Sequence, residues 1–190
     1  MNMQKIIYPF DEQIPKTGAT QAIHAGLKWV RMPLPFALDH INLWLIRDCF
    51  EGRDGWTLVD CGVSNEASKN AWLNIFNAEL ENLPIVRIIV THMHPDHIGL
   101  ASWLSERWSA PLWMTMTDYV LAKWLSDPRG SEVGSVAGGG GAADHFARHG
   151  LANEDDLKKI RARANYFSNM VPSVPPRFRR IMDQELIQIG

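Results

Sequence analysis

The most informative part of the sequence is residues 85–100, which read IVRIIVTHMHPDHIGL. Residues 85–90 are apolar apart from Arg87 and rich in β-branched side chains, which is typical of a buried strand. After them, Leu100, Trp103, Leu104 and Trp108 recur at helical spacing. The histidines between these segments are therefore predicted to lie on a turn from strand to helix, where several side chains can point at one place.

This turn places three histidines and one aspartate, His92, His94, Asp96 and His97, within six consecutive residues. Neutral imidazole nitrogens and a carboxylate are good ligands for zinc and similar divalent ions. His92 and His94 alternate by two, so both can project to the same side as the strand ends. Asp96 and His97 follow Pro95 and can approach from another direction. The pattern favours two adjacent metal ions, each held by one of these pairs; the alternative is a surface turn that happens to be rich in histidine.

The motif His92-Met93-His94-Pro95-Asp96-His97 resembles the H-x-H-x-D-H signature of the metallo-β-lactamase-fold hydrolases, which include glyoxalase II-like thioesterases and lactonases. Residues 56–62, WTLVDCG, resemble the strand of that family that ends in an aspartate and a glycine ahead of the metal motif. The resemblance runs roughly over residues 26–111 and weakly beyond them.

The resemblance implies an α/β protein with a metallo-β-lactamase-like αββα sandwich, of which this chain supplies the N-terminal half plus a helical insertion. We therefore expect one domain over residues 1–190, incomplete at its C-terminus, with a Gly-rich loop and helical insertion at residues 127–180. The family completes its metal site with a further histidine, a bridging aspartate and a last histidine. These cannot be assigned here and are expected beyond Gly190, so the chain is interpreted as an N-terminal fragment.

The resemblance also implies a function: hydrolysis of an ester, thioester or lactone by water activated on zinc, with two ions in the complete protein. Asp96 is expected to be both a ligand and the catalytic residue that orients the attacking water. Asp60, at the end of its strand, is expected to bond to the ligand turn and help to hold it. A β-lactam substrate is not indicated.

Three alternatives remain open at the level of sequence. The same fold can hold iron and act as a sulfur dioxygenase or an oxygen reductase, although the reductases generally replace the second histidine with glutamate and this chain has His94. The chain can also be an inactive fragment with an incomplete metal site. Nucleic-acid processing is disfavoured by the formal net charge of -2 and the absence of a long basic run.

The remaining histidines are expected to play no part in the metal site. His145 and His149 are four residues apart, but Phe146 stands where a metalloprotease helix carries glutamate. His24 and His40 are interpreted as ordinary hydrogen-bonded residues. The glycine run at 138–141 lacks a following Gly-Lys-Ser or Gly-Lys-Thr, so it is interpreted as a mobile lid or linker rather than a phosphate loop.

A chain of 190 residues with 46% hydrophobic and 21% charged residues suits one globular domain. No signal peptide or membrane-length apolar run is evident, and there are only two cysteines. We expect a cytoplasmic protein with a small-molecule substrate, without a nucleic-acid or membrane partner; the sequence does not indicate an oligomeric state.

Local patterns predict the order of the elements. Strands are expected at residues 6–8, 27–32, 41–47, 56–60, 85–91, 111–115 and 185–190. The turn at residues 92–97, which carries the four predicted ligands, is called the metal turn below. Helices are expected from Ser64 or Asn65 to before Pro84, from the metal turn to Trp108, from Thr117 to Leu125, over 142–149, and from Asn153 to about Val171.

Overall fold

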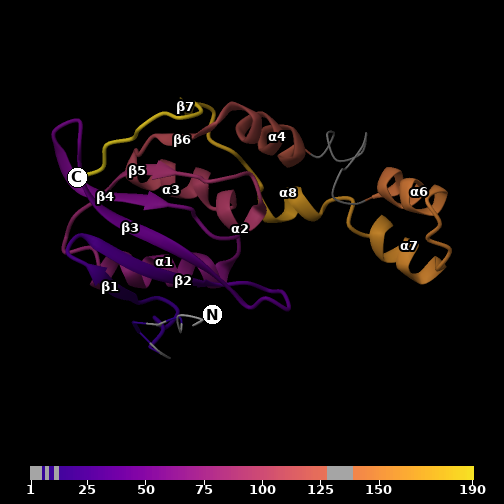
Figure 1. Cartoon of the computed structure of the whole chain (residues 1–190), viewed down its shortest axis with the longest axis horizontal. Coiled ribbons are helices and arrows are strands. Elements are labelled where there is room, and N and C mark those ends of the chain that lie inside the picture. Colours follow the sequence, from indigo (N-terminus) through magenta and orange to yellow (C-terminus); the bar gives the residue numbers. More distant parts are fainter. Residues whose placement is uncertain (1–5, 7–8, 11–12, 128–138) are drawn as a thin grey trace, which may run out of the picture.

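The computed structural model describes residues 6, 9–10, 13–127 and 139–190, and a seven-stranded mixed sheet forms its centre (Figure 1). The strands lie side by side in chain order: β1 Thr20–His24, β2 Leu27–Pro33, β3 His40–Phe50, β4 Arg53–Val59, β5 Ile85–Ile89, β6 Leu112–Thr115 and β7 Arg179–Ile181. β1 to β4 pair antiparallel, whereas β4 to β7 pair parallel. The expected α/β class is confirmed.

The helices of the described residues are α1 Glu66–Ala78, α2 Pro95–Ile98, α3 Ala101–Trp108, α4 Met116–Ser126, α6 Gly140–Arg148, α7 Glu154–Arg161 and α8 Tyr166–Met170. Two of them, α1 and α3, follow β4 and β5 and cover one face of the sheet (Figure 1). α1 buries Trp72 and Ile75, and α3 buries Leu104, against the apolar side chains of the strands. This core holds the parallel strands in place, and so fixes the ends from which the metal turn leaves.

The two faces of the sheet differ because side chains alternate along each strand. On the helix-covered face Leu45, Leu58 and Ile88 are fully buried. On the other face the side chains of one row, which crosses five paired strands, are only half-buried: Trp29, Trp44, Val59, Ile89 and Trp113. The described residues form one sheet, so this part of the chain does not contain the second sheet of a sandwich.

The second face also carries a buried ion pair. Arg87 on β5 donates to Asp48 on β3 at 2.6 Å, and the side chains are 3% exposed each. β4 lies between these two strands, and the hydroxyl of its Thr57 donates a hydrogen bond to the same carboxylate and accepts one from Arg87. Gly190 N–H donates to Asp48, and the carbonyl of Gln188 accepts from Arg87, so the last residues cover the pair. The ion pair with Asp48 thus explains how Arg87, the one charged residue of the predicted strand at 85–90, can be buried.

Several predicted boundaries are wrong. Residues 185–190 form no strand; β7 lies instead at Arg179–Ile181, against β6. The helix expected from Asn153 to Val171 is two helices, because residues 162–165 form turns between α7 and α8. The helix expected to run from the metal turn to Trp108 also divides, into α2 and α3.

Other differences are smaller. β1 lies where no strand was predicted, and α4 is capped by Thr115 rather than Thr117. Residues 7–8 of the strand expected at 6–8, and most of the Gly-rich segment, lie outside the described residues. α6 begins at Gly140, inside the segment expected to be a loop. In the described part of the chain, no helix is both long and apolar enough to cross a membrane.

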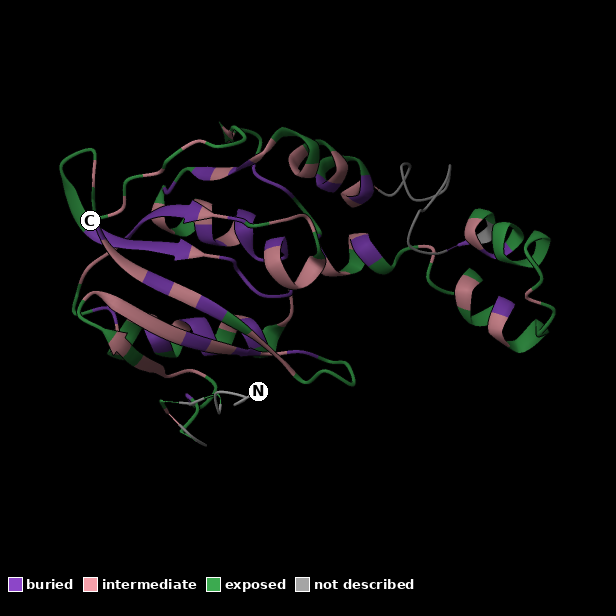
Figure 2. Cartoon of the chain, viewed as in Figure 1, coloured by how far each residue is buried: buried purple, intermediate pink, exposed green. Residues whose placement is uncertain are grey.

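The expected helical insertion lies mostly away from the metal turn. α6 and α7 form a pair at one end of the molecule and are exposed over most of their surface (Figures 1 and 2). By contrast α8, with Tyr166 and Phe167, lies beside α2 and α4. Of the helices in this segment, α8 therefore borders the metal turn, whereas α6 and α7 do not.

Candidate metal site

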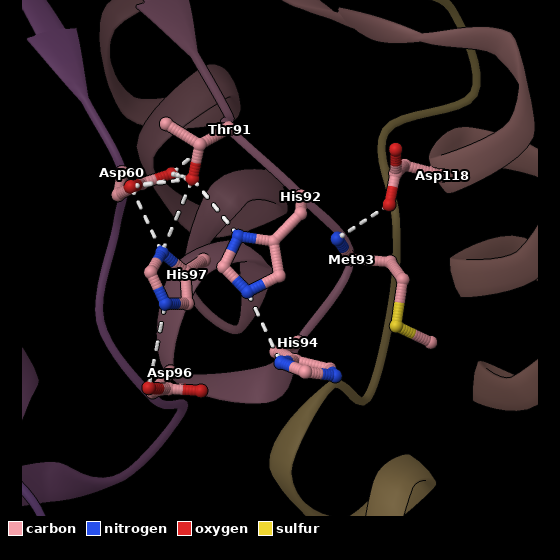
Figure 3. Close-up of polar contacts among 8 residues, drawn as sticks. All are labelled: Asp60, Thr91, His92, Met93, His94, Asp96, His97 and Asp118. Atoms are coloured by element: carbon pink, nitrogen blue, oxygen red, sulfur yellow. Dashed lines mark hydrogen bonds and ion pairs between the residues drawn. The ribbon is translucent and has the colours of Figure 1, made fainter.

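The site forms where β4 and β5, which are parallel neighbours, end at the same edge of the sheet. Asp60 follows β4, and Thr91 and His92 follow β5. The backbone of Asp60 has a φ of 63°, a left-handed conformation that aspartate tolerates better than most residues. This bend turns the Asp60 side chain towards the residues that follow β5, as Figure 3 shows.

Asp60 is 5% exposed, and its carboxylate accepts several hydrogen bonds from the turn. The Thr91 N–H donates at 2.8 Å, the Thr91 hydroxyl at 2.8 Å, and His97 Nδ1 at 2.9 Å (Figure 3). A buried carboxylate needs such partners, because an unpaired charge away from water is costly. The contact expected between Asp60 and the ligand turn is present.

These bonds decide which imidazole nitrogens carry protons. Asp60 accepts from His97 Nδ1, so the lone pair of His97 lies on Nε2. The Thr91 hydroxyl donates to Asp60 and therefore accepts from His92 Nδ1, at 3.0 Å. The lone pair of His92 then also lies on Nε2. One carboxylate thereby orients two imidazoles and leaves both with a nitrogen free to bind a metal ion.

The free nitrogens point at the other two predicted ligands. His92 Nε2 lies 3.0 Å from His94 Nδ1, and His97 Nε2 lies 3.5 Å from Asp96 Oδ2 (Figure 3). Two donor atoms bound to one tetrahedral zinc, at about 2.0–2.2 Å each, stand roughly 3.3 Å apart. The structure therefore brings the four residues together in the two pairs expected, at separations that suit shared ions.

The two pairs are adjacent but do not merge into a larger donor set. The ring centres of His92 and His97, one from each pair, lie 3.9 Å apart. Within residues 6, 9–10, 13–127 and 139–190, no three histidine, cysteine, aspartate or glutamate side chains converge tightly enough to hold one ion. The donor chemistry of this turn fits a divalent metal.

Close backbone packing holds the turn against the end of β4. Cys61 N–H donates to the His97 carbonyl at 2.7 Å, and Leu100 N–H donates to the Gly62 carbonyl at 3.1 Å. A Cβ atom on Gly99 would lie 2.6–2.8 Å from three backbone atoms, which real Cβ atoms do not approach. A residue with a Cβ atom therefore does not fit in place of Gly99. The next residue, Leu100, is buried in the core.

Asp118, on the first turn of α4, is a contributor that the sequence analysis missed. One carboxylate oxygen accepts the N–H of Met93 at 3.1 Å (Figure 3). The other accepts the hydroxyl of Thr115 at 2.6 Å. Met93 lies between His92 and His94, so Asp118 ties the first pair to the start of a helix. Residues 115–118 read TMTD, a capping-box pattern that marks this helix start but does not indicate the contact with Met93.

The local environment favours a neutral imidazole and an inert thiol. Burial lowers the pKa of His92, and the neighbouring His97 and His94 lower it further. A neutral imidazole is the form that binds a metal. Burial and the charge of Asp60 raise the pKa of the Cys61 thiol, so Cys61 is a buried residue rather than a nucleophile.

The other histidines lie elsewhere. His40 contacts Asp39 and Arg31, and His24 contacts a neighbouring carbonyl. His145 and His149 lie against each other at the C-terminal end of α6, with ring centres 4.4 Å apart and ring planes tilted by 48°.

A parallel sheet edge that carries paired histidine and carboxylate donors defines a metal-binding α/β protein. The family model described as the Metallo-beta-lactamase superfamily matches residues 37–165, and this chain belongs to that superfamily.

Known proteins resemble the chain over different lengths. The crystal structure of a beta-lactamase domain protein from Burkholderia ambifaria is 46% identical, with a TM-score of 0.84, over 96% of this chain and 50% of that chain. The metallo-beta-lactamase family protein TTHA1429 from Thermus thermophilus is 24% identical, with a TM-score of 0.61, over 88% of this chain and 50% of that chain, and is a likeness of fold. The probable metallo-hydrolase YqjP of Bacillus subtilis (strain 168) is 30% identical over 80 residues, which are 40% of this chain and 23% of that protein. The chain thus spans half or less of these relatives.

Proposed function

We propose that the chain provides the metal turn of a zinc-dependent hydrolase that acts on an ester, thioester or lactone. The observation that carries the proposal is the pairwise approach of His92 to His94 and of Asp96 to His97, with Asp60 orienting one imidazole in each pair. Membership of the superfamily and the likeness to a probable metallo-hydrolase support the same reaction class.

In this proposal His92 and His94 hold one ion, while Asp96 and His97 hold the other. When bound, zinc lowers the pKa of its water towards neutrality, and it also polarises the carbonyl group that this water attacks. Asp96 also accepts a hydrogen bond from the attacking water and so orients it, which is its catalytic role. Asp60 holds His97 and Thr91 in place and keeps the imidazole nitrogens that face the ions free of protons.

The test is hydrolysis of a thioester, an ester and a lactone by the zinc-loaded chain and by variants of the turn. His92→Ala and Asp96→Asn are expected to lower kcat/KM roughly 100-fold or more, since both act on the activated water. His145→Ala is the matched control, because it removes an imidazole far from the turn. Activity of both turn variants equal to that of the control would refute the proposal.

A second candidate is a chain that binds metal weakly and has no hydrolytic activity by itself. It is favoured by the absence, in the described part of the chain, of three donors converging on one point. The test is the zinc content and the hydrolytic rate of the 190-residue chain, measured at saturating zinc. Stoichiometric zinc together with measurable hydrolysis argues against an incomplete site.

Iron-dependent oxidation is the remaining alternative. Metal analysis of natively purified protein distinguishes it, because iron together with oxygen consumption contradicts the hydrolase proposal. The glyoxalase II-like branch, the small-molecule substrate and the cytoplasmic setting stay predictions from the sequence, as does the absence of nucleic-acid and membrane partners.

A further inference from the structure

A cavity of about 550 Å³ opens directly beside the metal turn. Residues 93–96 form one wall, and the loop between β2 and β3 forms another. α4 and α8 close the remaining sides, with Leu121 and Leu125 from α4 and Phe167 from α8. The cavity therefore starts at two of the predicted ligands, His94 and Asp96, and extends away from them.

The cavity has a fixed apolar interior and a more open mouth. Leu34, Leu125 and Phe167 are 8% exposed or less, so they form a packed wall. Phe36 and Leu38 in the loop between β2 and β3 are 39% and 62% exposed. These two side chains can therefore contact a ligand in the cavity, and the contact would bury apolar surface that is now exposed to water.

Charge is confined to one end of the cavity. The imidazole and the carboxylate that line it, His94 and Asp96, both lie on the metal turn, and the other polar side chain of the lining, the phenol of Tyr166, is 37% exposed. A charged or strongly polar group placed deeper would lose its water without gaining a partner, which is unfavourable. An apolar group there gains from burial, and the volume falls within the usual range for small-molecule sites.

Resting on the proposed hydrolase function, we propose that this cavity holds the apolar acyl chain of an ester or thioester substrate, with its carbonyl beside His94 and Asp96. The acyl chain is bonded directly to the attacked carbon, so it is the group that continues from the metal turn into the cavity. Water adds to the carbonyl carbon and the C–O or C–S bond breaks. The alcohol or thiol leaves with one proton, and the acid is released as a carboxylate and a second proton.

The first arm of the test measures binding without catalysis. Calorimetric titrations of the chain with butyrate, hexanoate, octanoate and decanoate are expected to give affinities that rise roughly threefold per added methylene. The double variant Phe36→Gln with Leu38→Gln alters exposed positions at the mouth and is expected to reduce the preference for decanoate over butyrate about tenfold. Val120→Gln is the control, since Val120 is a 54% exposed apolar residue of α4 that does not line the cavity.

The second arm measures kcat/KM for 4-nitrophenyl esters with acyl chains from acetyl to decanoyl, and for acetate esters of lengthening alcohols. The inference expects a rise with acyl length alone, and a loss of that rise in the double variant. Acyl-length-dependent binding without hydrolysis would leave the cavity assignment standing and contradict the proposed function. Hydrolysis at equal rates for all acyl lengths, a dependence on alcohol length instead, or affinities that do not change with chain length would each overturn the assignment.

Discussion

At the scale of single residues, the tautomers of the metal turn depend on Asp60. Its carboxylate accepts from His97 directly and from His92 through the Thr91 hydroxyl, and it is too buried for water to replace these bonds. The proton positions of both imidazoles therefore depend on an acceptor-only group that lies more than 30 residues earlier in the sequence.

Asp60→Asn is expected to lower zinc affinity about 10–100-fold. Asparagine tolerates the left-handed backbone of this position. Its NH₂ group, however, is a donor that faces His97 Nδ1, which is also a donor in the present tautomer. The substitution therefore favours the other tautomer of His97, in which the proton lies on the metal-facing nitrogen. Chelator competition at fixed pH measures the change, and Asp54→Asn, at an exposed position of β4, is the control. An affinity equal to that of the control would contradict this role.

Asp118 supports the turn from the opposite side, by accepting the N–H of Met93. Asp118→Ala is expected to weaken zinc binding several-fold and to lower stability by about 1 kcal/mol, because it also removes the contact with the α4 cap. Asp118→Asn keeps an acceptor oxygen and should recover most of the zinc affinity. If asparagine fails to restore binding beyond the alanine level, the hydrogen bond to Met93 does not hold the turn.

At the scale of elements, an ion pair on the second face of the sheet joins β3 to β5 across β4. Burial would raise the pKa of Asp48, but hydrogen bonds from Thr57, Gly190 N–H and Arg87, with the guanidinium charge, hold that pKa below its ordinary value. A carboxyl with a lowered pKa in the folded state stabilises the fold above its unfolded-state pKa of about 3.9, and this contribution is lost as the pH falls through the folded-state value.

Arg87→Met is expected to cost about 3–5 kcal/mol in the free energy of unfolding at pH 7, because it leaves the Asp48 carboxylate buried without its cation. The cost should shrink as the pH falls from the unfolded-state pKa of about 3.9 through the lowered folded-state pKa of Asp48, because no buried charge remains once this carboxyl is protonated. Urea denaturation at several pH values measures both effects. Lys69→Met, which breaks the exposed pair with Glu66, is the control and should cost less than about 0.5 kcal/mol. Equal costs for the two variants, or a cost independent of pH, would contradict this account.

At the scale of the whole molecule, the site joins distant parts of the chain. Asp60 comes from the end of β4, the four predicted ligands follow β5, and Asp118 comes from α4. A metal ion that binds the folded turn but not the unfolded chain must therefore stabilise the entire fold by mass action.

Zinc at about 100 times its dissociation constant is expected to add roughly 2.7 kcal/mol of stability and to raise Tm by about 5–10 °C. The double variant His92→Ala with His94→Ala should lose much of this shift, whereas His145→Ala with His149→Ala should keep it. Differential scanning calorimetry with and without zinc provides the measurement. A shift that follows the α6 histidines instead would place the metal elsewhere.

Local sequence determined the elements that carry the site. The β-branched run of β5, Pro95 at the first position of α2 and the apolar spacing of α3 are short-range patterns, so strand, turn and helix followed from neighbours in the chain. The pairing of His92 with His94 and of Asp96 with His97 followed for the same reason. β7 could not be predicted in this way, because a three-residue edge strand with two arginines is defined by its pairing with β6.

The four predicted ligands and the family could thus be recognised from the sequence alone, since all four residues lie on one short turn. Only the tertiary structure decided the proton positions of His92 and His97, the support from Asp118 and the apolar cavity beside His94. Each of these depends on contacts between segments tens of residues apart, and such contacts exist only once hydrophobic burial has packed the sheet and its helices together.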